Sequence, residues 1–214
     1  MRRLVHLVLS PVSRLVRLCV GEKRLACEFE FAEDPAAHLP LLIEPDGARR
    51  EGLWAILDHL EGTYPEQPLT PEDPEARAEV LRWLDWAMGS FHEQVTQKIV
   101  FEKAVQRFTG AVSRRVPDMN VIRGGREQLR PALELVGNAA ETHGNLGSRQ
   151  CTVGDLAVAA QFSTLDYFGE IPWSEFPAAA EWYLRVKSRP AFRALLADRV
   201  PGQPPVSNYA ELDF

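Results

Sequence analysis

The segment from Glu66 to Pro74 divides the chain into two parts that differ in their apolar patterns. It is rich in proline and acidic residues and shows no apolar periodicity, which is typical of a domain boundary. Short apolar runs alternate with helical patterns before this segment, whereas only helical patterns follow it. The sequence therefore predicts an α/β domain over residues 1–65, a linker over residues 66–74 and an all-α domain over residues 75–214.

The first part predicts the order strand, helix, three strands and helix. The apolar run from Leu4 to Leu9 is typical of a strand that is buried on both faces. Ser10 and Pro11 then supply an N-cap and a first-turn proline for a helix that Gly21 closes. We expect further strands at 27–31 and 39–43, a possible fourth strand after a turn at 44–47, and a helix at 53–60.

The apolar spacing in the second part of the chain predicts helices. One long helix is expected because six apolar residues share a face: Val80, Leu84, Ala87, Phe91, Val95 and Ile99. Thr152 and Asp155 have the spacing of a capping box that opens another helix. Further helices are expected at 128–140, 176–186 and 190–196, with a basic loop at 109–120 and no regular element after residue 198.

Charge and composition exclude several classes of protein. Lys and Arg number 24 against 30 Asp and Glu, and the formal net charge of -6 argues against a nucleic-acid partner. The 3 cysteines are scattered and the 5 histidines have no ligand spacing, so we expect neither a disulfide framework nor a metal site. No apolar stretch approaches the roughly 20 residues that span a bilayer. We therefore expect a cytoplasmic protein that does not bind membranes.

Three motifs together resemble the glutathione S-transferase superfamily. They are residues 10–18 at the first strand-helix turn, Leu39-Pro40 before the third strand, and residues 152–156 in the helical domain. The resemblance covers nearly the whole chain. It implies a thioredoxin-like N-terminal domain, shortened here, packed on an all-α domain, and a symmetric homodimer.

The carboxyl third is similar to one branch of this superfamily in particular. Residues 165–173, 186–190 and 208–214 resemble an alphaproteobacterial, FzlA-like branch, which includes a protein that binds the tubulin-like division protein FtsZ. The resemblance therefore implies FtsZ, or another protein, as a partner.

The superfamily resemblance also implies a glutathione site at Ser10, Leu39, Pro40 and Glu51. A hydroxyl at Ser10 would donate to the glutathione thiolate, and a bond worth about 1.5–3 kcal/mol would lower the thiol pKa by roughly one to two units. Capping of the first helix is the alternative role for Ser10, and Ser13 is a second candidate. A cis Leu39-Pro40 bond would align the tripeptide, whereas a proline at a strand start is the alternative. Glu51 would contact the γ-glutamyl end.

Two departures from the superfamily pattern predict a degenerate site. Gly52 stands where the family has a serine, and only residues 32–39 separate the second strand from Pro40, too few for the usual helix and loop. We therefore expect no required cofactor, with glutathione as a substrate or a vestigial ligand. Arg49 and Arg50 could bind a carboxylate or belong to a solvated loop.

The last residues combine apolar anchors with acidic groups, as a recognition segment would. The residues assigned to partner binding are Asn208, Tyr209, Glu211, Leu212, Asp213 and Phe214. The alternative is a terminus that packs on its own domain or frays. Arg107, just before the basic loop, with Arg114 and Arg115 inside it, forms a second possible contact, with a solvated surface as the alternative.

Two hypotheses follow for function. The first is a non-catalytic adaptor of the FzlA-like branch that binds FtsZ in cell division. The second is an active glutathione S-transferase in which Ser10 stabilises the thiolate.

Overall fold

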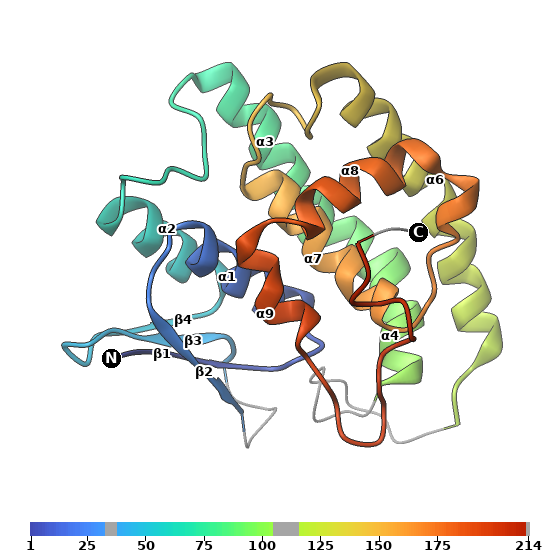
Figure 1. The fold of residues 1–214 in the computed structure, drawn as a ribbon, viewed down its shortest axis with the longest axis horizontal. Coiled ribbons are helices and arrows are strands. Elements are labelled where there is room, and N and C mark those ends of the chain that lie inside the picture. Colours follow the sequence, from blue (N-terminus) through green and yellow to red (C-terminus); the bar gives the residue numbers. More distant parts are fainter. Residues whose placement is uncertain (33–37, 105–115, 213–214) are drawn as a thin grey trace.

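The computed structural model describes residues 1–32, 38–104 and 116–212 of the chain. A small sheet with two helices forms the N-terminal domain, and the regular elements of the rest of the described chain are all helices (Figure 1). This arrangement confirms the predicted fold class of an α/β domain followed by an all-α domain. No helix of the described residues is long and apolar enough to cross a membrane.

The sheet is mixed, with the strand order β2-β1-β3-β4. Its strands are β1 (Arg2–His6), β2 (Cys27–Phe31), β3 (Leu41–Ile43) and β4 (Arg49–Glu51). β1 is parallel to β2 and antiparallel to β3, and β3 is antiparallel to β4. The possible fourth strand is therefore confirmed. It also corrects one expectation, because Arg49 and Arg50 lie on β4 and not on a loop.

The first strand differs from its prediction. It spans Arg2–His6, whereas the apolar run predicted a strand from Leu4 to Leu9. Its side chains alternate between buried and more exposed positions, so burial on both faces was a wrong expectation. Helices α1 and α2 lie on the same side of the sheet in Figure 1, which explains why one face of β1 is covered. Leu7 and Leu9 are buried in the turn that follows the strand.

Helix α1 spans Pro11–Glu22, and α2 spans Leu53–Thr63. Ser10 caps α1 as predicted, since its Oγ accepts from the backbone N–H of Ser13 at 3.5 Å. Gly21 does not close the helix but lies within it. A methyl group at Gly21 would come within 2.8 Å of the Ala191 Cβ. The glycine is therefore there because a distant segment packs closely against α1.

A continuous helical rod opens the second domain. It consists of α3 (Pro74–Trp86), the π-helix η1 (Ala87–Thr96) and α4 (Gln97–Lys103). All six apolar residues of the predicted face are buried. The steps from Ala87 to Phe91, Val95 and Ile99 are four residues each, close to one helical turn, so these residues lie on one face of the rod.

The next helix, α6 (Met119–His143), begins earlier than expected. Asp118 caps it by accepting from the N–H groups of Asn120 and Val121. Gly125 lies inside the helix, where a Cβ would meet the Ile99 side chain at 2.8 Å, so this glycine allows close helix packing. The expected loop at 109–120 therefore ends before Met119. Arg107, Arg114 and Arg115 lie outside the described residues.

Helix α7 (Val153–Tyr167) occupies the centre of the domain, and every residue in it is buried. The predicted capping box is confirmed, with the Thr152 N–H donating to the Asp155 carboxylate at 2.9 Å. The same carboxylate accepts from the Trp182 indole at 3.0 Å. The remaining elements are η2 (Trp173–Glu175), α8 (Pro177–Lys187), η3 (Pro190–Phe192) and α9 (Arg193–Leu196).

Candidate functional site

The residues of the expected glutathione site lie at one edge of the sheet. Val5 of β1 is opposite Leu41 of β3, which is opposite Glu51 of β4. The Leu39-Pro40 peptide bond directly before β3 is cis, which is the first of the two alternatives for this proline. The turn that carries Ser10 follows β1 at this same edge. The fold thus brings Ser10, Leu39, Pro40 and Glu51 to one region, while their role in binding glutathione stays a prediction.

The Ser10 hydroxyl is half-buried at the amino end of α1. Its hydrogen bond from the Ser13 N–H is long, at 3.5 Å, and leaves the hydroxyl hydrogen free to donate elsewhere. Partial positive charge at a helix amino terminus favours an anion nearby. Ser13, the second candidate, is fully buried and accepts from the Leu7 N–H at 3.2 Å, so it stabilises the turn.

The part of this region that contains Glu51 is open to solvent. Glu51 is exposed, and the neighbouring Gly52 N–H donates to the Pro40 carbonyl at 2.9 Å. Gly52 has a φ of 78°, which favours glycine over a serine. The position where the family has a hydroxyl therefore contributes only a backbone contact here. No cluster of metal-ligating side chains occurs among the described residues.

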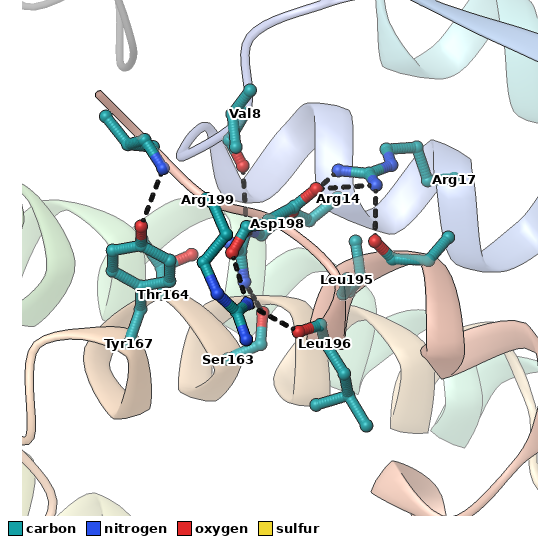
Figure 2. A network of polar contacts seen from close by, with 12 residues as sticks. Val8, Arg14, Arg17, Ser163, Thr164, Tyr167, Leu195, Leu196, Asp198 and Arg199 are labelled. Carbon is teal, nitrogen blue, oxygen red and sulfur yellow. Dashed lines mark hydrogen bonds and ion pairs between the residues drawn. The ribbon is translucent and has the colours of Figure 1, made fainter. Parts of the chain in front are cut away.

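A buried polar cluster that the sequence analysis missed joins the two domains. Arg14 and Arg17 of α1 both point toward Asp198, which follows α9 (Figure 2). Arg17 binds the Asp198 carboxylate with two nitrogens, at 2.8 and 2.9 Å, and donates to the Ala194 carbonyl at 2.8 Å. All three side chains are largely buried: Arg14 is 0% exposed, Arg17 is 4% exposed and Asp198 is 10% exposed.

The only sequence signal for this cluster is the position of two arginines on α1. They lie three residues apart, away from the apolar set that predicted the helix, and such a face is expected to be solvated. The helical domain covers that face instead. His6, next to the cluster, has its pKa lowered to about 4 by burial and by the charge of Arg17.

The C-terminal segment packs along the helical domain up to Tyr209. The Val206 N–H donates to the Tyr167 carbonyl at 3.1 Å, and the Gln203 side chain donates to the Lys103 carbonyl at 2.6 Å. Tyr209 is 1% exposed, and its hydroxyl donates to the Leu195 carbonyl at 3.1 Å.

The residues on either side of Tyr209 are exposed to solvent, whereas its own side chain is buried. Asn208 and Glu211 are exposed, and Leu212 is 48% exposed. Asp213 and Phe214 lie outside the described residues. The segment thus combines an internally packed aromatic residue with an exposed surface, and the assignment of that surface to a partner stays a prediction.

The chain matches known proteins over its whole length. It is 39% identical to FtsZ-localized protein A of Caulobacter vibrioides, over 100% of this chain and 98% of that protein. Its fold is similar to FzlA from C. crescentus, with a TM-score of 0.92, 38% identity and coverage of 100% and 99%. It is also similar to a glutathione S-transferase from Rhodospirillum rubrum F11, with a TM-score of 0.94, 37% identity and full coverage of both chains. No family model matches the chain.

Proposed function

Because the chain belongs to the glutathione S-transferase superfamily, and within it to the family of FtsZ-localized protein A, we propose that it binds FtsZ filaments as a non-catalytic adaptor in cell division. The observation that carries this proposal is the match to FtsZ-localized protein A at 39% identity over 100% of the chain. The adaptor would act in the cytoplasm, with FtsZ or another protein as its partner and no nucleic acid. Its partner surface would be the exposed residues Asn208, Glu211 and Leu212 together with the last two residues.

A co-sedimentation assay with assembled FtsZ tests this proposal. The intact protein should pellet with filaments and stay in solution with unassembled FtsZ. Removal of residues 208–214 should abolish pelleting. If the truncated protein pellets as well as the intact one, the assignment of the C-terminal segment is wrong.

Two leucines of similar exposure provide a matched pair for the same assay. Leu212 in the C-terminal segment is 48% exposed, and Leu135 on α6 is 47% exposed. Leu212→Glu should weaken pelleting, whereas Leu135→Glu should leave it unchanged. An equal loss in both variants would mean that added negative charge, and not the segment, is responsible.

We propose that the glutathione site is degenerate and that the adaptor requires no cofactor. The support is that Gly52 lacks the hydroxyl and that its N–H is used by the Pro40 carbonyl. The Ser13 hydroxyl is likewise used within the turn. Glutathione would then be a vestigial ligand at most.

The alternative is an active glutathione S-transferase. It is favoured by the half-buried Ser10 hydroxyl, whose contact with the Ser13 N–H is weak, at 3.5 Å, and leaves it able to donate to a thiolate. Calorimetry with glutathione separates the two functions. A binding free energy of about -8 to -4 kcal/mol, with turnover that Ser10→Ala removes, would favour the enzyme. No heat at several millimolar glutathione would exclude conventional glutathione chemistry.

A symmetric homodimer is part of the proposal. Its support is an exposed apolar region between α2 and α3, where Trp54 is 56% exposed and Leu81 is 36% exposed. Both line a cavity of about 300 Å³. Exposed aromatic residues beside an apolar cavity are typical of protein interfaces.

In sedimentation the intact protein should have twice the 24.0 kDa chain mass, and Trp54→Glu should give a 24.0 kDa monomer. A monomeric intact protein would contradict the dimer.

A further inference from the structure

Tyr209 lies within the proposed partner-binding segment, and yet its side chain faces the protein interior. It is 1% exposed, while the neighbouring Asn208 and Glu211 are exposed. Its ring packs edge-on against Tyr167, with centroids 5.2 Å apart. A side chain placed in this way contributes to binding through the position that it gives to its neighbours.

The hydroxyl of Tyr209 is held by Arg14 of the N-terminal domain. The Arg14 guanidinium is fully buried and donates to four groups from three parts of the chain. These are the Val8 carbonyl at 2.8 Å, the Ser163 hydroxyl at 2.9 Å, the Tyr209 hydroxyl at 2.9 Å and the Asp198 carboxylate at 3.3 Å. One guanidinium therefore connects the turn before α1, the central helix α7 and the C-terminal segment. Figure 2 shows Val8, Ser163 and Asp198 around Arg14.

The charge of Arg14 makes these contacts strong. Burial alone would lower the pKa of Arg14, but Tyr209 and Asp198 more than offset that effect, so its pKa lies above the ordinary value. Burial raises the pKa of Tyr209, which keeps the phenol neutral and able to donate to the Leu195 carbonyl. A hydrogen bond to a buried charge is stronger than one between neutral groups.

We propose that Arg14 is a positioning residue that anchors Tyr209 and thereby holds Asn208, Glu211 and Leu212 where a partner can bind them. The N-terminal domain thus places a surface that belongs to the last residues of the chain. The anchoring stands on the contacts of Arg14, whereas its effect on partner binding rests on the proposed function.

Hydrogen exchange of the C-terminal segment tests the anchoring directly. Tyr209→Phe and Ser163→Ala each remove one hydroxyl that accepts from the same Arg14 nitrogen, at 2.9 Å in both cases. Only the first hydroxyl belongs to the C-terminal segment. The amides at positions 206, 209 and 211, which donate within the segment or to α7, should exchange at least about tenfold faster in Tyr209→Phe. They should be unchanged in Ser163→Ala.

Equal exchange of these amides in Tyr209→Phe and the intact protein would overturn the anchoring. Equal acceleration in both variants would do the same, because a general loosening of the buried cluster would then be sufficient. The midpoint of global unfolding, measured alongside, shows whether a change is confined to the segment.

FtsZ co-sedimentation tests the effect on the partner. Tyr209→Ala should lower pelleting as much as removal of residues 208–214 does, and Ser163→Ala should pellet like the intact protein. If Tyr209→Ala releases the segment and still pellets normally, the positioning role is wrong. If the intact protein itself does not pellet, the proposed function fails, and the exchange experiment still decides the anchoring.

Discussion

The Ser10 hydroxyl has two alternative roles, as the cap of α1 or as a donor to a glutathione thiolate. It accepts from the Ser13 N–H at 3.5 Å, which is at the outer limit of a hydrogen bond. Capping therefore uses little of its hydrogen-bonding capacity. In an adaptor the residue matters for the stability of α1 alone, whereas in an enzyme it would matter for turnover.

We predict that Ser10→Ala leaves FtsZ co-sedimentation unchanged and lowers the free energy of unfolding by about 0.5–1 kcal/mol. The value lies at the low end for an N-cap because the bond is long. Urea denaturation measures the stability change. A loss of FtsZ binding in a stable Ser10→Ala protein would contradict the separation of this turn from the partner surface.

His6 makes stability depend on pH. Burial, with the charge of Arg17, lowers its pKa from 6.5 to about 4, and its Nδ1 has no hydrogen-bond partner among the described residues. Between these pH values the unfolded chain binds a proton that the folded chain does not. The contribution of His6 is therefore complete above pH 6.5 and is lost as pH falls toward 4, by roughly 3 kcal/mol in total.

The difference between the intact protein and His6→Gln isolates this contribution, because buried carboxylates also titrate in acid. Unfolding free energies measured from pH 7.5 to 4 should fall more steeply in the intact protein than in His6→Gln. His143→Gln, at an exposed position, should follow the intact protein. Parallel profiles for all three proteins would exclude a lowered pKa at His6.

At the scale of elements, close helix packing decides where glycines occur. Gly21 of α1 and Gly125 of α6 each lie where a Cβ would come within 2.8 Å of another side chain. In sequence, Gly21 is interpreted as a helix end. The reason for both glycines is the approach of η3 to α1 and of the helical rod to α6, which no local pattern contains.

Two glycines in helices should respond in opposite directions to the same substitution. Gly21→Ala should lower the unfolding free energy by about 1–3 kcal/mol, because the new methyl group clashes with Ala191. Gly62→Ala on α2 has nothing within 4 Å of the added Cβ and should raise it by about 0.5–1 kcal/mol. Chemical denaturation checks both values. A stabilised Gly21→Ala protein would show that α1 and η3 do not pack this closely.

At the scale of the whole molecule, charged contacts connect the two domains. Arg14 and Arg17 of α1 bind Asp198 in the buried cluster. Near the other end of α1, the Glu22 carboxylate accepts from two nitrogens of Arg189, each at 2.7 Å. Because both domains contribute to the same pairs, we expect them to unfold together.

Asp198→Asn should lower the unfolding free energy by about 3 kcal/mol, because it leaves buried arginine charge without its carboxylate. Tryptophan fluorescence and far-UV circular dichroism should still give coincident transitions. Glu30→Gln removes an exposed ion pair with Arg3, at 3.0 Å, and should change stability by about 0.5 kcal/mol or less. Separate transitions by the two probes would show that the domains unfold independently.

Local sequence patterns were enough to predict the order of the elements, the Ser10 cap and the Thr152 capping box, and three short motifs were enough for the resemblance to the superfamily. These features depend on residues a few positions apart or on a repeating pattern, so they can be read without knowing the fold. The long helical face was predicted for the same reason, and the structure confirms it, because all six of its members are buried.

The burial of Arg14, the inward position of Tyr209 and the reason for Gly21 could not be predicted from the sequence, because each depends on how distant segments pack. Ser163 and Tyr209, which both bind Arg14, lie 149 and 195 residues further along the chain. An arginine on the polar face of a helix is expected in solvent until a second domain covers that face and supplies its acceptors. Such burial depends on contacts between segments that are distant in sequence, and no local spacing records them.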